Sequence, residues 1–69
     1  MGQILRDMHG FKIGEIKADS GTRVLYDRYG YRLGRYEEHA NMTFDQYGNQ
    51  VGWGDLLGTL LARALQDQD

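Results

Sequence analysis

Residues 27–34 read Asp27-Arg28-Tyr29-Gly30-Tyr31-Arg32-Leu33-Gly34, the middle copy of a pattern that occurs three times in this chain. The other two copies begin at Asp7 and Asp45, so the copies start 20 and 18 residues apart. All three have the form Asp-x-(His/Tyr)-Gly-x-x-(aliphatic)-Gly. Repeats at such a short period indicate an architecture built from copies of one supersecondary unit.

The first four residues of each copy predict a tight turn. Asp at the first position and Gly at the fourth are typical of a type I β-turn. The Asp carboxylate can accept a backbone N–H two residues on, and the Gly can adopt a positive φ without a Cβ clash. Such a turn followed by a left-handed residue closes a three-residue hairpin loop. We therefore expect three β-hairpins with tips at 8–10, 28–30 and 46–48. The structural turn residues are Asp7, Gly10, Asp27, Gly30, Asp45 and Gly48.

The alternation of side chains along each strand gives an expected register. In the second hairpin Leu25 should face Leu33, Tyr26 should face Arg32, and Val24 should oppose Gly34. The equivalent pairs are Leu5–Ile13, Arg6–Lys12 and Ile4–Gly14 in the first hairpin, and Thr43–Val51, Phe44–Gln50 and Met42–Gly52 in the third. A glycine inside a strand costs stability, so its recurrence predicts bulges or a close approach of backbones where the hairpins converge.

After Gly54 the apolar residues change to a helical spacing. Leu56, Leu57, Leu60, Leu61, Ala64 and Leu65 fall on one side of such a helix, and Asp55 is its expected N-cap. This helix either covers the open side of the hairpin array or pairs with the same helix of another chain. We expect one domain over residues 1–69, with hairpins at about 3–17, 22–37 and 41–53 and a helix at about 55–66.

The repeat resembles two groups of bacterial sequences. Tyr26-Asp27-Arg28-Tyr29-Gly30 and Phe44-Asp45-Gln46-Tyr47-Gly48 are similar to the YD-type repeats of large toxin shells, although the first copy has Arg6 before Asp7. Over roughly residues 3–54 the chain resembles the small β-flower domains. That resemblance implies hairpins arranged as petals of a shallow pseudo-symmetric barrel or sheet, closed or covered by the helix, in a mainly β fold. Four petals are typical of the group, so the helix or a divergent segment takes the place of one.

The composition limits the classes of function. The chain has 69 residues and no Cys, which excludes disulfides and thiolate metal sites. Domains this small usually gain stability from a staple or a second subunit, so we expect a homo-oligomer through Leu56, Leu57, Leu60, Leu61 and Leu65. The N-terminus lacks the features of a secretory signal, and no apolar run is long enough to span a membrane, so we expect a cytoplasmic protein. No cofactor motif is present.

The second hairpin carries the most distinctive surface. Residues 23–36 contain four Arg and one Asp, a charge of +3 in a chain whose net charge is −2. The candidate partner-binding residues are Arg23, Tyr26, Arg28, Tyr29, Tyr31, Arg32, Arg35 and Tyr36. Interleaved Tyr and Arg anchor acidic protein partners or stack on the bases of nucleic acids. They also pair with one another on exposed sheets, which is the commoner role.

Other candidate sites have simpler structural interpretations. His9 takes a tip position that Tyr fills in the other copies, and His39 follows Glu37 and Glu38 in a linker where a weak metal site is conceivable. We interpret both histidines as structural or solvated, and the three repeated aspartates as turn residues, so no catalytic residue is assigned. The favoured function is a non-enzymatic protein-interaction or assembly module. Nucleic-acid or polyanion binding through residues 23–36 is the alternative, and an enzyme with a central pocket is the third hypothesis.

Overall fold

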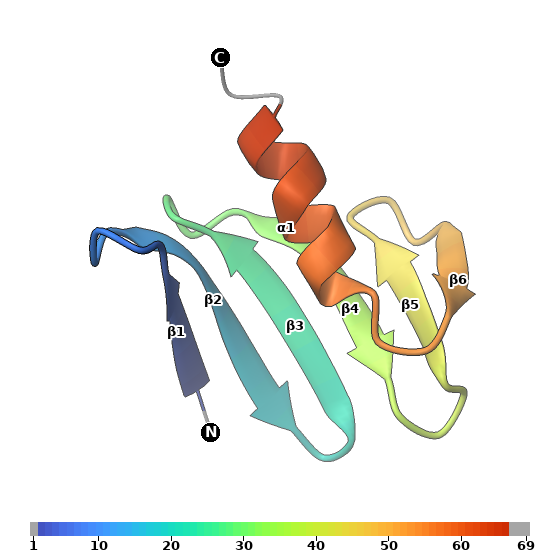
Figure 1. Ribbon diagram of the computed structural model, residues 1–69. Helices are drawn as coiled ribbons and strands as arrows, with labels where there is room; N and C mark the ends of the chain where they lie inside the picture. Colours follow the sequence, from blue (N-terminus) through green and yellow to red (C-terminus); the bar gives the residue numbers. More distant parts are fainter. Residues whose placement is uncertain (1, 67–69) are drawn as a thin grey trace.

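Six antiparallel strands follow one another along the chain and in space, and one helix lies on one face of the sheet that they form (Figure 1). The computed structural model describes residues 2–66. The elements are β1 (Gly2–Arg6), β2 (Lys12–Asp19), β3 (Thr22–Asp27), β4 (Arg32–Glu37), β5 (Met42–Asp45), β6 (Gln50–Trp53) and α1 (Leu57–Gln66). The mainly β class with three hairpins and a C-terminal helix is confirmed. Among the described residues no helix is long and apolar enough to cross a membrane.

The sheet is open, so of the two expected arrangements, a shallow barrel or a sheet, the structure has the sheet. β1 and β6 form its two edges and do not pair with each other. The hairpins also do not stand apart as petals, because β2 pairs with β3 and β4 pairs with β5. The linker after β2 explains this continuity: Ser20 and Gly21 both have positive φ, as in the two-residue turns that join neighbouring strands. The three hairpins therefore form one continuous meander.

The three repeat turns have the hydrogen bonds that the Asp-to-Gly spacing predicts. In the second turn the Gly30 N–H donates to the Asp27 carbonyl at 3.1 Å, and the Asp27 N–H donates to the Tyr31 carbonyl at 2.8 Å. Gly30 has a φ of 91°. The Asp27 carboxylate accepts the N–H groups of both Tyr29 and Tyr31 at 2.9 Å. Asp7 and Asp45 make the same bonds in their own turns.

A bulge corrects the expected register in every hairpin. Tyr26 lies opposite Arg32, as predicted, but Leu25 then lies opposite Gly34, and Leu33 is an extra residue between them. The first and third hairpins repeat this arrangement. The wrong pairs are Leu5–Ile13, Leu25–Leu33, Thr43–Val51, Ile4–Gly14, Val24–Gly34 and Met42–Gly52. The reason is that one unpaired residue in β2, β4 and β6 shifts all pairs beyond it by one position.

The shifted register places the second glycine of each copy beneath the helix. A Cβ on Gly34 would lie 2.5 Å from Leu60 Cδ1 and 2.5 Å from the Phe44 carbonyl oxygen. A Cβ on Gly14 would lie 3.1 Å from Leu61 Cδ1, and one on Gly52 would lie 2.9 Å from Leu56 Cδ1. Each hairpin therefore has one glycine that leaves space for one leucine. Leu61 and Leu60 of α1 occupy this space at the first and second hairpins, and Leu56, directly before α1, occupies it at the third.

The hydrophobic core lies between the helix and this face of the sheet. Its buried members are Leu25, Leu57, Leu60 and Leu61. Leu5, Ile13, Ile16, Leu33, Tyr36, Val51 and Leu65 pack around them and are partly buried.

The helix begins two residues later than predicted. The Leu56 carbonyl accepts the N–H groups of Thr59 and Leu60, so Leu56 is the N-cap. Asp55 contributes from one position earlier, because its carboxylate accepts the Leu57 N–H at 3.1 Å. The Thr43 hydroxyl, fully buried, accepts the Leu56 N–H at 2.9 Å and donates to the Gly54 carbonyl at 2.7 Å. The start of the helix is thereby joined to β5.

Candidate interaction surface

The three repeat turns lie at one end of the sheet, and the two linker turns lie at the other (Figure 1). This follows from the meander, in which alternate turns share an end. Large apolar side chains are exposed on all three repeat turns: Met8 (92%), Phe11 (70%), Tyr29 (69%), Tyr31 (72%) and Tyr47 (79%). We call these five residues the tip surface. These side chains contribute little to the core, so a partner that binds here could bury them.

The side chains of the tip surface belong to turns whose backbone is held by hydrogen bonds. In each turn one aspartate carboxylate accepts two backbone N–H groups. Two main-chain hydrogen bonds also close each turn, one to the carbonyl of the aspartate and one from its N–H. The residues that carry Tyr29 and Tyr31 are the ones whose N–H groups Asp27 holds. A side chain on an ordered turn loses less conformational entropy on binding than one on a mobile loop. The turn chemistry therefore pre-organises the rings.

The structure divides the eight candidate residues of the second hairpin among three places. Arg28, Tyr29 and Tyr31 lie at the tip, where Arg28 is 5.8 Å from the centre of the Tyr29 ring. Tyr26, Arg32 and Arg35 lie on the face of the sheet that the helix leaves open. Arg23 and Tyr36 lie on the helix-covered face, as partners in the register of β3 and β4. The eight residues do not form one surface.

Arg23 and Tyr36 have structural partners. Arg23 Nη1 lies 2.6 Å from Asp55 Oδ2, next to the start of the helix, and its guanidinium lies 5.8 Å from the centre of the Tyr36 ring. The Tyr36 hydroxyl donates to Asn41 Oδ1 at 2.9 Å. These contacts connect the helix, the sheet and the linker turn after β4. They give both residues a role in the fold.

On the open face the aromatic rings are covered by cations. Arg35 stacks over Phe44 at 4.3 Å and forms an ion pair with Glu37 at 3.0 Å. Lys17 lies over the Tyr26 ring at 5.2 Å. The Arg32 side chain, by contrast, makes no hydrogen bond, ion pair or ring contact with any residue that the structure describes. Arg32 lies at the start of β4, next to Tyr31, and is available to a partner.

The two ends of the sheet differ in charge. Arg6, Lys12, Arg28 and Arg32 flank the repeat turns, whose three aspartates point their carboxylates at backbone N–H groups. Asp27 is 7% exposed. The linker turns carry Asp19, Glu37 and Glu38. The exposed charged side chains at the repeat turns are therefore basic. The linker turns themselves carry acidic side chains, of which Asp19 and Glu38 are exposed and Glu37 is paired with Arg35.

In the third turn the hydrogen bonds to Asp45 lower the pKa of its carboxyl group. The N–H of Asn49 donates to it at 2.9 Å and holds its pKa below the usual 3.8. The N–H of Tyr47 and the side-chain amide of Asn49 act in the same direction. Each donor stabilises the ionised form, so this carboxylate is suited to closing a turn and not to donating a proton.

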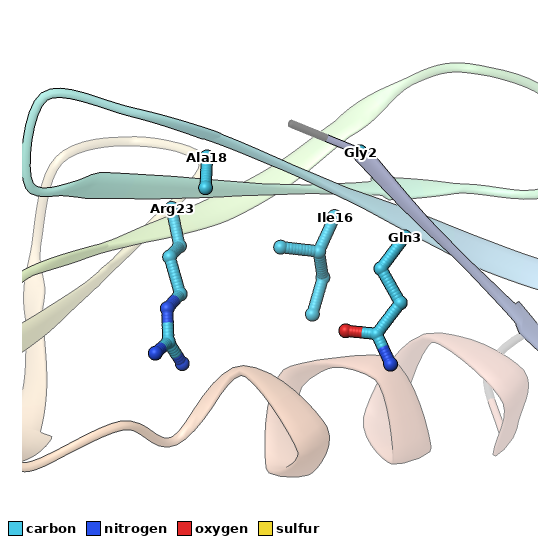
Figure 2. Close-up of a pocket in the computed structure, with 5 residues that line it drawn as sticks. All are labelled: Gly2, Gln3, Ile16, Ala18 and Arg23. Atoms are coloured by element: carbon cyan, nitrogen blue, oxygen red, sulfur yellow. The ribbon is translucent and has the colours of Figure 1, made fainter.

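Two shallow clefts lie away from the tip surface. The larger, about 280 Å³, is lined by Gly2, Gln3, Ile16, Ala18 and Arg23, and Figure 2 shows Gln3, Ile16 and Arg23 pointing from the sheet toward the helix layer. The smaller, about 160 Å³, lies at the turn between β2 and β3. Neither lining pairs a nucleophile with a histidine base. Within residues 2–66, His9, His39 and the carboxylates form no group of three that could hold a metal ion.

The leucines expected to mediate self-association lie largely against the chain's own sheet. Leu57, Leu60 and Leu61 are buried, and Leu56 and Leu65 are partly buried. The helix therefore covers the hairpin array, which was one of the two predicted roles. The homo-oligomer through these leucines stays a prediction.

The sequence pattern located part of the tip surface. Tyr29 and Tyr31 were candidates, whereas Met8, Phe11 and Tyr47 were not. The available signal was their position, because they flank the first glycine of the repeat just as Tyr29 and Tyr31 do. Their position at the same end of the sheet depends on the meander, which the repeat alone did not predict. Comparisons of the chain with known protein families, with curated proteins and with solved structures found no match.

Proposed function

We propose that this chain is a non-enzymatic protein-interaction module whose tip surface binds an acidic segment of another protein. The observation that carries the proposal is the exposure of five large apolar side chains on three ordered turns at one end of the sheet. Aromatic side chains with neighbouring arginines are the residues that dominate binding energy in protein interfaces. Arg28 and Arg32 accompany Tyr29 and Tyr31 in this way.

The charge at the tip end supports an acidic partner. Arg6, Arg28 and Arg32 are exposed there, while the turn aspartates are engaged with the backbone. The linker end, with its acidic side chains, would repel the same partner. Charge complementarity of this kind mainly raises the association rate and selects the orientation of binding, while the rings supply apolar contact.

Nucleic-acid or polyanion binding is the alternative that shares these residues. Tyr29 and Tyr31 could stack on bases and Arg28 and Arg32 could bind phosphates. The net charge of −2 favours a protein partner over a nucleic acid. An enzyme has less support, because the described clefts hold no recognisable set of catalytic side chains.

We also infer a relationship to the small β-flower domains. Its support is the series of three short hairpins over roughly residues 3–54, whose turns share the pattern Asp-x-(His/Tyr)-Gly. The open meander is a different arrangement from petals around a barrel. The relationship therefore rests on the hairpin unit and not on the arrangement of the hairpins.

Titration of the ¹⁵N-labelled chain with a short poly-glutamate peptide tests the proposed function. We expect chemical-shift changes at the amides of residues 28–31 and 46–48, which weaken as salt is added. The double variant Tyr29→Ser/Tyr31→Ser should bind at least about tenfold more weakly, the effect of losing about 1.4 kcal/mol. The matched control is Trp53→Ser, because Trp53 is 73% exposed but lies on β6, away from the tips.

The same titration distinguishes the alternatives. Shifts confined to the linker turns, or an equal loss of binding in Trp53→Ser, would overturn the assignment of the tip surface. A parallel titration with oligo(dT) tests the nucleic-acid alternative. Tighter binding of oligo(dT) than of poly-glutamate, lost when Arg28, Arg32 and Arg35 become Ala, would replace the protein-partner proposal.

A further inference from the structure

The outer edge of β1 is unpaired. β1 (Gly2–Arg6) is the first strand of the sheet and pairs with β2 alone. An edge strand of this kind presents a row of main-chain N–H and C=O groups that can pair with another strand. Natural proteins usually protect such edges with proline, with inward-pointing charges or with bulges. The edge strand itself has no proline, and its residues on the helix-covered face are Gln3 and Leu5, which are uncharged.

The other edge of the sheet is better protected. β6 has only four residues, against five in β1. The register shift of the third hairpin also falls within β6, where Val51 is the extra residue. A short, bulged strand presents fewer main-chain groups in line, so β1 is the edge more suited to pairing.

We propose that two copies of this chain pair antiparallel through β1, about a two-fold axis at Ile4, to form one continuous sheet. This register aligns all five residues of β1 with all five of the second copy. Ile4 then faces the second Ile4, Leu5 faces Gln3, and Arg6 faces Gly2. No two like charges lie directly opposite each other, an arrangement that would destabilise the pair. Ile4 is 48% exposed in the single chain, so its side chain gains burial.

The larger cleft is a second observation at the same edge. It lies over the first three strands, and Gly2 and Gln3 of β1 form one side of its lining (Figure 2). In the proposed register Leu5 of the second copy lies beside Gln3 on the helix-covered face. The second copy would therefore add an apolar side chain next to the side of the cleft that β1 lines.

A second copy fits this edge better than an unrelated extended peptide. The two-fold register uses the complete length of β1 on both sides, and closed two-fold dimers are the commonest assemblies of soluble proteins. Among the described residues of β1 and β2, the nearest new pair of like-charged positions is Arg6 of one copy and Lys17 of the other, measured between their backbones. They are separated by two strand spacings, about 10 Å, which is near the screening length at physiological salt. This inference is independent of the tip surface and of its partner.

Charge reversal at the two-fold axis tests the proposal. Ile4→Lys and Ile4→Glu each place two like charges opposite each other, so each variant alone should dimerise at least about tenfold more weakly than the native chain. An equimolar mixture of the two should recover a species of twice the 7.9 kDa chain mass. Sedimentation equilibrium measures all of these, and circular dichroism checks that both variants keep the native sheet. Trp53→Glu, on the opposite edge, is the matched control and should dimerise normally.

Each remaining outcome contradicts the proposal. A native chain that stays at 7.9 kDa at high concentration has no β1 dimer. Dissociation by Trp53→Glu would move the interface to β6, and failure of the mixture to recover a dimer would show that Ile4 does not lie on the axis. In a mixed-label sample of the native chain, a contact between Ile4 methyl groups of different copies should be seen. Its absence in a dimer, or β1 binding an added acidic peptide while the chain stays monomeric, would also overturn it. Poly-glutamate binding at the tips is measured separately, so either proposal can fail alone.

Discussion

At the scale of single residues, the two glycines of each repeat have different physical roles. The first, as at Gly30, has a φ of 91° and open space around it, so the constraint is the backbone conformation. The second, as at Gly34, has no positive φ but faces Leu60 and the Phe44 carbonyl, so the constraint is space. One type of residue therefore recurs for two reasons, and substitutions at the two positions should fail differently.

Gly30→Val tests the first role. A β-branched residue at positive φ is strained whatever the surrounding space, so we expect the free energy of unfolding to fall by about 2 kcal/mol. Lys12→Ala is the comparison, because it removes only the half-exposed ion pair with Glu15 at 3.3 Å and should cost less than about 1 kcal/mol. Urea denaturation measures both. Equal losses of stability would show that the turn assignment is wrong.

Gly34→Ala tests the second role, with Gly58→Ala as its control. The added methyl at position 34 must displace Leu60 or the neighbouring strand, so we expect a loss of about 1–3 kcal/mol. Gly58 lies in α1 with nothing within 4 Å of a new Cβ, so the same change there should raise stability by up to about 1 kcal/mol. Thermal melts of the two variants should therefore shift in opposite directions. A Gly34→Ala variant that is as stable as the native chain, or more stable, would contradict the close contact between Gly34 and Leu60.

The stability that the third turn contributes should depend on the ionisation of Asp45. Because the N–H of Asn49 lowers its pKa below 3.8 in the folded chain, the ionised form contributes stability above the unfolded value, and this contribution is lost as the pH falls through the folded pKa. An NMR titration of the Asp45 carboxyl carbon should have its midpoint below 3.8. Asp45→Asn should remove the corresponding part of the acid dependence of stability. A midpoint at or above 3.8 would contradict the bonding of this turn.

At the scale of elements, the helix and the sheet are joined through Thr43 of β5. Its hydroxyl is fully buried and satisfies both the Leu56 N–H and the Gly54 carbonyl. Thr43→Val keeps the shape but leaves both groups without a partner, so we expect a loss of about 2–4 kcal/mol despite the more apolar side chain. Thr43→Ser retains the hydroxyl and should cost about 1 kcal/mol or less. Urea unfolding measures both variants. If Thr43→Val loses no more stability than Thr43→Ser, the hydrogen bonds of the Thr43 hydroxyl do not join the helix to β5.

The elements themselves were largely predictable from the sequence, and their register was not. Asp-to-Gly spacing located the three turns because turn chemistry is local. Helical spacing identified α1 because its leucines recur at three and four residues. The bulge at Leu33 left no local mark, since an aliphatic residue alternates equally well in a regular strand. Only the recurrence of the second glycine in each repeat indicated an irregularity. The reason for the glycine at position 34 is its contact with Leu60, which lies 26 residues further along the chain.

At the scale of the whole molecule, the arrangement of the hairpins lay beyond the repeat. The same turn signals suit separate petals or a continuous meander, because they fix each hairpin and not the pairing between hairpins. The sequence signal was the turn-forming cluster that contains Ser20 and Gly21. In the structure both residues have positive φ, as in the two-residue turns that connect adjacent strands. The tip surface could not be predicted from the repeat for the same reason. Tyr29 and Tyr31 were recognisable in one hairpin, but their grouping with Met8, Phe11 and Tyr47 is a property of the assembled sheet.

Three copies of one hairpin unit each accommodate, at their second glycine, one leucine of the C-terminal segment 56–66. Nuclear Overhauser effects between the leucine methyl groups and the glycine Hα protons measure this directly. We expect contacts of Leu61 with Gly14, of Leu60 with Gly34 and of Leu56 with Gly52, all within one chain. Absence of these contacts, or their appearance only between chains in a mixed-label sample, would contradict the account.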